Sequence, residues 1–181
     1  MLRKNKNPSA YFKMKTVSIT TFLFLYSTSY ANATPNQGLC SKDEINLFNC
    51  NIKNKNASLC INEAKNRMQY RIGTWAKKDF IYPQTPKSNE YSFRLSTTPY
   101  PGGGENRIRF ANGIYNYFIY DITRSQQDGT SIDSIQTAGI AVYENSKRIA
   151  SLKCENSETS IFPLAFEILQ REEFSHDINT D

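Results

Sequence analysis

Arginine residues recur at alternating positions in three short stretches of the chain. Each stretch is typical of a half-buried β-strand, because apolar residues occupy the positions between the arginines. Guanidinium groups bind carboxylates, phosphates and sulfates through paired hydrogen bonds. Neighbouring strands would give a cationic face suited to an acidic protein patch or an anionic glycan. The alternative is a solvated face whose arginines bridge to Glu or Asp across strands. The residues concerned are Arg67, Arg71, Arg94, Arg107 and Arg109.

Tyrosine is dense in one part of the chain. Tyr115, Tyr117 and Tyr120 lie within six residues, and Tyr100 stands in a preceding Gly/Pro-rich loop. Tyrosine is a favoured interface anchor, but successive strand residues point to opposite faces, so half of these rings are expected in the core. Trp75 is the single tryptophan. It either covers the core, which we expect, or stacks on a sugar.

Signatures of catalysis are weak. The one histidine, His176, stands in a polar end of the chain, where we expect it to be solvent-exposed, so a His-activated nucleophile is not indicated. The run from Gly102 to Gly104 lacks the Lys-Ser/Thr of a phosphate-binding loop and is read as a plain loop. Asp121 with a second acid could support carboxylate-dependent hydrolysis. We therefore predict a non-enzymatic protein with no catalytic residues and no cofactor.

Four cysteines predict two disulfides in an exported chain. Residues 47–52 and 57–61 resemble the arms of a hairpin. A three-residue turn over 54–56, with Asn56 left-handed, places Cys50 opposite Cys60 and leaves Cys40 for Cys154. A two-residue turn would shift the register and remove that pairing. A metal site is not expected, because the chain has no C-x-x-C pair.

The first 33 residues have the pattern of a secretory signal. Basic residues precede an apolar run of about ten residues, and Ala31-Asn32-Ala33 supplies the small-x-small cleavage pattern. Met1 and Met14 are both candidate translation starts, and a start at Met14 would give a more compact signal. The apolar run is far shorter than the roughly 20 residues of a spanning helix. We expect cleavage after Ala33 and a soluble periplasmic or secreted product without a stable membrane anchor.

Charge balance argues against nucleic acid as a partner. Five of the 22 Lys and Arg residues and none of the 17 acidic residues lie in the leader, so the remaining chain is neutral. Duplex binding depends on excess positive charge facing phosphates. Beyond Cys154 the chain holds seven acidic residues and one arginine, which makes an acidic tail on a basic body.

The hydrophobic pattern predicts a mainly β fold, an antiparallel sandwich or small barrel of about seven to nine strands with one C-terminal helix. Period-two alternation marks most strands, and the doubly apolar stretch 114–122 reads as a central strand. Asn112-Gly113 is a strong hairpin signal. The clearest predicted strands span 67–72, 91–96, 107–110, 114–122, 137–143 and 148–153.

The C-terminal region is expected to form a helix over 162–174, with Pro163 in its first turn. Residues 175–181 are expected to be disordered. The predicted organisation is a signal peptide over 1–33, a lead-in over 34–46, a β-domain over 47–154 and an acidic helix and tail over 155–181.

Several spaced elements resemble a family of small exported bacterial proteins without an assigned function. The resemblance covers most of residues 47–154 and implies a bacterial, disulfide-bearing β-domain, with no catalytic residues to transfer. The matching elements are Phe48-x-Cys50, Ser58-Leu59-Cys60, Gln69-Tyr70-Arg71-Ile72-Gly73, Phe110-x-Asn112-Gly113-x-Tyr115-x-Tyr117, Gly139-Ile140-x-Val142 and Cys154.

A fainter likeness links the chain to C-type periplasmic lysozyme inhibitors, small β-barrels with disulfides and a tyrosine-rich Asn-Gly-x-Tyr strand. The stretch from Phe110 to Tyr115 is similar to that strand. The lipoprotein cysteine common in that group is absent at the cleavage site, which again predicts a soluble product.

These observations favour an exported binding protein with a protein partner in the cell envelope. Its specific form would be an inhibitor or immunity-type protein for an envelope hydrolase. The alternatives are a glycan- or envelope-binding module that uses Trp75, Tyr100 and the arginines, and a small hydrolase built on Asp121. The predicted binding residues are Arg94, Arg107, Arg109, Tyr100, Tyr115 and Tyr117, with the loop over 99–104.

Overall fold

A computed structural model of the chain describes residues 38–85, 92–128, 131–156 and 159–180. The predicted signal peptide lies outside these residues. Within them the chain forms ten strands and one short helix, and the mainly β prediction is confirmed. The elements are β1 (Glu44–Ile52), β2 (Lys55–Asn62), β3 (Met68–Gly73), β4 (Lys78–Tyr82), β5 (Arg94–Tyr100), β6 (Gly103–Asn112), β7 (Tyr115–Asp128), β8 (Ser131–Glu144), β9 (Lys147–Lys153), α1 (Leu164–Ile168) and β10 (Gln170–Arg171).

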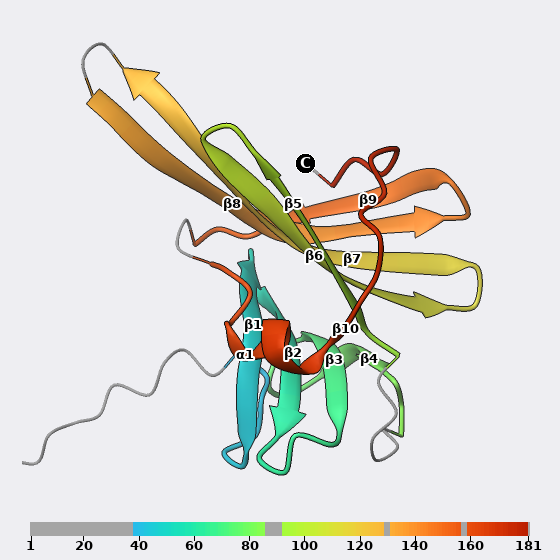
Figure 1. Cartoon of the computed structure of the whole chain (residues 1–181). Coiled ribbons are helices and arrows are strands. Elements are labelled where there is room, and N and C mark those ends of the chain that lie inside the picture. The colour runs from blue at the N-terminus through green and yellow to red at the C-terminus, as the bar shows by residue number, and fades with distance from the viewer. Residues whose placement is uncertain (1–37, 86–91, 129–130, 157–158, 181) are drawn as a thin grey trace, which may run out of the picture. The chain divides into compact units, whose positions relative to one another are not determined.

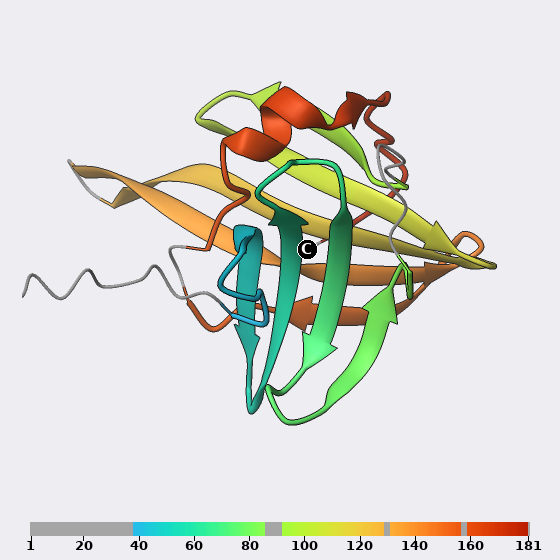
Figure 2. The same cartoon turned by 90° about the horizontal axis from the view of Figure 1, so that it is seen from below.

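The strands form two sheets that pack face to face. The smaller sheet has the order β1-β2-β3-β4, and the larger has the order β10-β5-β6-β7-β8-β9. All neighbours are antiparallel except β10 and β5, which are parallel. Figures 1 and 2 show the strands of one sheet crossing those of the other. The arrangement is a β-sandwich.

Aromatic rings from both sheets fill the space between them. Tyr70 of β3 lies 5.1 Å from Phe110 of β6, and Tyr82 of β4 stacks on the same Phe110 ring at 4.7 Å. Tyr117 of β7 stacks on Phe80 of β4 at 5.3 Å. Offset and edge contacts of this kind add to the apolar area that each ring removes from water. These rings therefore join the two sheets into one core.

The predicted disulfide pairing is wrong. The bonds join Cys40 to Cys60 and Cys50 to Cys154. The β1–β2 hairpin closes through two residues, because Ile52 pairs with Lys55 and Lys53 adopts a left-handed φ of 53°. This register places Cys50 opposite Ala57 instead of Cys60. Two disulfides indicate that the protein matures in an oxidising compartment.

The C-terminal region also differs from its prediction. The helix covers only Leu164–Ile168, not 162–174, and Leu169 then adopts an extended conformation. The chain continues into β10, where Glu172 donates its backbone N–H to the Leu95 carbonyl at 2.9 Å. Pairing with the open edge of β5 satisfies backbone groups that a longer helix would satisfy internally. Residues 175–180, expected to be disordered, lie against the larger sheet, where Ser175, Asn179 and Thr180 are hydrogen-bonded to it.

Candidate functional site

The predicted arginine face is only partly assembled. Arg107 and Arg109 alternate along β6 with the core residues Ile108 and Phe110, so both point to the outer face of the larger sheet. Arg94 on β5 lies directly opposite Arg109. The other two predicted members do not join them. Arg71 lies on β3 of the smaller sheet, and Arg67 immediately precedes that strand.

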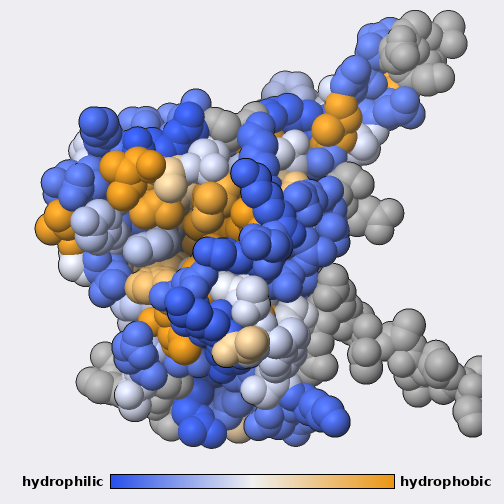
Figure 3. Space-filling view, turned by 180° about the vertical axis from the view of Figure 1, so that it is seen from behind, coloured by the Kyte–Doolittle hydropathy of each residue, from blue (hydrophilic) through white to orange (hydrophobic). Residues whose placement is uncertain are grey.

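Residues 172–180, which we call the C-terminal strap, cover this outer face. The strap is fixed at its far end, where Tyr143 donates its hydroxyl to the Asn179 carbonyl at 2.6 Å and accepts the Asn179 N–H at 3.0 Å. Thr180 is buried and donates its hydroxyl to Glu105, and Ile178 packs against a second apolar cluster that contains Phe118. Figure 3 shows hydrophobic surface divided by hydrophilic bands on the side seen from behind.

Arg107 is bound within the protein and is only 4% exposed. Its Nε donates to Glu105 at 2.6 Å, and its Nη1 donates to the Ser175 carbonyl of the strap at 2.8 Å. The guanidinium carbon also lies 3.9 Å from the centre of the Phe174 ring. A buried charge needs such partners, because leaving it unpaired in the interior is very costly. Arg107 therefore holds the strap to the sheet.

Arg109 forms a forked ion pair with the strap. Its Nε lies 2.9 Å and 3.0 Å from the two carboxylate oxygens of Glu172, and its Nη2 lies 2.6 Å from one of them. The hydrogen bonds to Glu172 raise the pKa of the Arg109 guanidinium. A hollow of about 310 Å³ remains between strap and sheet. Two of the guanidinium groups predicted to receive a partner, those of Arg107 and Arg109, thus bind the C-terminal strap of the same chain.

The predicted tyrosine anchors serve the interior. Tyr117 stacks on Phe110 at 4.7 Å inside the sandwich, and burial, with a smaller contribution from Tyr115, raises the pKa of its hydroxyl. Tyr115 itself is half-buried. Tyr100 donates its hydroxyl to the Gly104 carbonyl at 3.1 Å and packs against the cluster beneath the strap. These side chains do not form an open binding face.

Asp121 is a buried structural carboxylate. Its Oδ2 accepts the Ile161 N–H at 2.6 Å, and its Oδ1 accepts the side-chain N–H of Asn106 at 2.7 Å. Burial raises the pKa of this carboxyl, hydrogen bonds from Ile161 and Asn106 oppose the rise, and the nearby Glu105 charge adds to it. Both carboxylate oxygens are engaged within the fold, so the geometry does not favour a hydrolytic role.

His176 is exposed and contacts Phe174.

The expectation that Trp75 lies in the core is wrong. The side chain is 61% exposed in the turn between β3 and β4. The Lys78 ammonium lies 4.9 Å from the ring centre and donates to the Trp75 carbonyl at 2.6 Å. Gly73, at φ +141°, passes so close to the backbone of residues 77–79 that a side chain there would clash. The tight turn directs Trp75 away from the sandwich.

The longest hairpin extends past its neighbours. The pairing of β6 with β7 ends at Arg124, and that of β9 with β8 begins at Gly139, whereas β7 and β8 pair through to Asp128 and Ser131. We call residues 125–127 and 132–137 the arm, visible at the upper left of Figure 1. The sequence pattern predicted that these two strands stop at residue 122 and start at residue 137, so the arm was not predicted. The Asp128-Gly129 turn signal, flanked by Thr123, Ile132 and Ile135, was the available indication of longer strands.

Comparisons with known proteins returned no relatives: no family model, curated protein or solved structure matches the chain. The fold and disulfides define a disulfide-linked β-sandwich. In the part of the chain that the structure describes, no helix is long and apolar enough to span a bilayer. The same residues contain no cluster of three or more His, Cys, Asp or Glu side chains placed to hold a metal ion.

Proposed function

We propose that this chain is an exported, non-enzymatic binding protein that recognises a protein partner through the arm. The observation that supports this proposal best is the outer edge of β8. Among the described residues, no strand pairs with the outer side of residues 132–137, because β9 reaches only Gly139. The Cys154 N–H donates to the Ala138 carbonyl at 2.9 Å, so backbone pairing on this side of β8 extends to Ala138. Within the part of the chain that the structure describes, six residues of this edge therefore remain open to a partner strand.

An open edge of this length can receive an added strand. Alternate residues of an edge strand direct their N–H and C=O groups outward, where an extended peptide can pair with them. Natural edges are often protected by lysine or proline, and residues 132–137 contain neither, with Asp133 as the single charge. The edge supplies affinity through backbone hydrogen bonds and specificity through its flanking side chains.

Two isoleucines give the arm an apolar character. Ile132 is 73% exposed and Ile135 is 44% exposed. They lie on opposite faces of β8, since they are three positions apart and successive strand residues point to opposite faces. Large exposed apolar side chains on a projecting element favour a contact that removes them from water. A cleft that admits a two-stranded ribbon would cover both side chains at once.

The specific form we propose is an inhibitor or immunity-type protein for a cell-envelope hydrolase. Enzyme clefts are concave, and a projecting hairpin has the complementary form. Residues 1–33 have the pattern of an export signal, and two disulfides fit a periplasmic or secreted location. The likeness of residues 110–115 to C-type lysozyme inhibitors points in the same direction. Arg107 and Arg109 are assigned to holding the strap in this proposal, whereas Arg94 donates to the Phe93 carbonyl at 3.1 Å.

Site-specific crosslinking tests the proposal. A photoreactive benzoylphenylalanine is placed at Ile132, with Ile149 of β9, which is 48% exposed, as the matched control position. In envelope extracts of the source organism, we expect adducts with one hydrolase from position 132 only, and stoichiometric inhibition of that purified enzyme by the wild-type protein. An Ile132→Lys/Ile135→Lys variant should fold and fail to inhibit. Identical adducts from both positions, or inhibition by the double variant, would contradict the proposal.

A glycan-binding function has one specific observation in its favour, the exposure of Trp75. Exposed aromatic rings are common platforms for flat or apolar ligand faces. That surface lies on the smaller sheet, whereas the arm belongs to the larger sheet. The two functions are therefore separable by mutation.

A further inference from the structure

One end of the smaller sheet gathers lysines around the single tryptophan. Asn56 at the start of β2 pairs with Gly73 at the end of β3, so the β1–β2 and β3–β4 turns lie side by side. We infer that this end, which we call the lysine end, is a second binding site that takes an acidic polysaccharide. The site is independent of the arm and does not rest on the function proposed above. Its lysines are Lys53, Lys55, Lys77 and Lys78.

Trp75 supplies the stacking surface of this site. The residue remains 61% exposed although the Lys78 ammonium lies over its ring. Each sugar ring has an apolar face of C–H groups that packs well on an indole, and the neighbouring ammonium offers a counter-charge for a carboxylate or sulfate on the same ligand. An aromatic ring held beside a cation therefore matches the two features of an acidic sugar.

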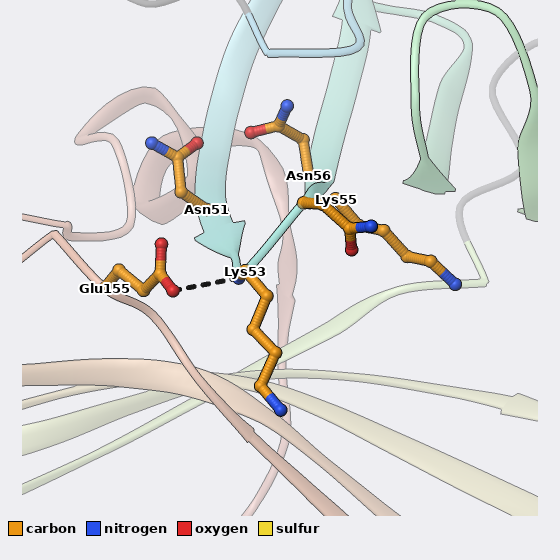
Figure 4. A pocket seen from close by; sticks show the side chains of 6 residues that line it. Asn51, Lys53, Lys55, Asn56 and Glu155 are labelled. Carbon is orange, nitrogen blue, oxygen red and sulfur yellow. Dashed lines mark hydrogen bonds between the residues drawn. The ribbon is translucent and has the colours of Figure 1, made fainter.

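A polar hollow of about 420 Å³ lies at the β1–β2 turn of the same end. Figure 4 shows side chains from the turn and from the segment after β9 around it. Glu155 accepts the Lys53 backbone N–H at 3.1 Å, which fixes the wall of the hollow. Side-chain amides donate and accept at once, as sugar hydroxyl groups do. The lining residues are Asn51, Lys53, Asn54, Lys55, Asn56 and Glu155.

The charge of the lysine end is positive after its internal pairs are counted. Lys55 forms an ion pair with Asp79 at 2.7 Å, and Glu155 is the other acid at this end. Within the described residues, the side chains of Lys53 and Lys77 form no ion pair and are exposed. Two exposed ammonium groups at separate turns suit a polymer that carries repeated negative charge better than a single small anion.

The chemistry favours a polysaccharide over a membrane surface. Interfacial membrane binding needs several apolar side chains that enter the lipid together. At the lysine end the two turns hold one large apolar side chain, Trp75, and the adjoining hollow is lined by amides and charges. A hydrated polyanion makes use of all these groups.

Trp75 also makes the test direct, because the chain contains no other tryptophan. Its fluorescence is followed while the full exported protein is titrated at low salt with alginate, a polyuronate, with neutral pullulan, and with phosphatidylglycerol vesicles. We expect a saturable shift with alginate alone. A Lys53→Ala/Lys77→Ala variant should bind alginate roughly three- to tenfold more weakly, as expected for two exposed charges. A Lys42→Ala/Lys147→Ala control, which loses the same charge elsewhere on the surface, should bind as the wild type does.

Three results would overturn the inference. Alginate could leave the emission unchanged, or the shift could occur with vesicles and not with alginate, which would assign the site to lipid. The control variant could instead lose as much affinity as the Lys53→Ala/Lys77→Ala variant, which would show non-specific attraction. Failure of the arm to bind a hydrolase would affect none of these results, since the arm and the lysine end are mutated separately.

Discussion

Asp121 shows how a candidate catalytic acid serves as a structural group. Its carboxylate receives one hydrogen bond from the segment before α1 and another from β6, so it fastens the C-terminal region to the larger sheet. Burial raises the pKa of this carboxyl. Because the folded protein then holds the proton more tightly than the unfolded chain, the Asp121 contribution to stability falls as pH rises from 3.8 through the raised pKa.

Substitution of Asp121 separates the stability that its hydrogen bonds supply from the pH dependence that its raised pKa causes. Asp121→Asn should remove the pH dependence, so the wild type loses stability relative to this variant as pH rises above 3.8. Asp121→Ala should cost about 1–3 kcal/mol of unfolding free energy, because the Ile161 N–H and the Asn106 amide lose their acceptor. Denaturant unfolding across pH measures both. Asp133→Asn, an exposed carboxyl on the arm, should behave as the wild type does, and a similar profile for Asp121→Asn and Asp133→Asn would refute the assignment.

At the scale of elements, the C-terminal strap covers the face that the sequence analysis assigned to binding. Glu172→Gln should lower the free energy of unfolding by about 1 kcal/mol, because it removes the charge that accepts hydrogen bonds from Nε and Nη2 of Arg109. The pair is partly exposed, so added salt should reduce the effect. Glu173→Gln makes the same chemical change one residue further along, at an exposed position, and should be neutral. Equal effects of the two variants would show that the ion pair does not hold the strap.

Strand patterns were readable from the sequence because a strand that buries one face alternates apolar and polar residues, whereas a strand buried on both faces is a continuous apolar run. The alternation at Met68, Tyr70 and Ile72 identified β3, and the doubly apolar stretch 114–122 identified a central strand. Asn112-Gly113 marked the β6–β7 hairpin, where Gly113 adopts a φ of 63°. Local signals of this kind depend on neighbouring residues, and they were sufficient to predict the fold class.

Features that depend on distant contacts were not readable. The left-handed residue of the β1–β2 turn is Lys53, although asparagine is the more usual choice. The turn therefore has two residues and not the predicted three, and the changed register accompanies disulfide pairs that differ from the predicted ones. The strap is held by Arg107, Tyr143 and Glu105, all far from it in sequence. An acidic tail opposite a basic body indicated attraction, but not which arginine would meet which carboxylate.

At the scale of the whole molecule, the two disulfides have different tasks. Cys40–Cys60 fixes the N-terminal segment to β2, whereas Cys50–Cys154 joins β1 of the smaller sheet to the end of β9 in the larger one. The bonds span 20 and 104 residues respectively. On the chain-entropy argument, the first stabilises by about 3 kcal/mol and the second by about 4–5 kcal/mol.

Paired serine substitutions test this difference. Cys50→Ser/Cys154→Ser should lower the free energy of unfolding more than Cys40→Ser/Cys60→Ser, as measured by denaturant unfolding without reductant. Peptide mapping of the unreduced protein should recover Cys40 with Cys60 and Cys50 with Cys154. Recovery of any other pairing would contradict the register of the β1–β2 hairpin on which the fold depends.

The open β8 edge is the central claim about function, and hydrogen exchange tests it most directly. In the free protein, amides of residues 132–137 that point away from β7 should exchange rapidly, whereas those of residues 139–144, paired with β9, should be protected. Addition of the purified hydrolase that the crosslinking experiment identifies should slow amide exchange at alternate positions of residues 132–137. Protection elsewhere on the molecule, with no change along this edge, would contradict the account.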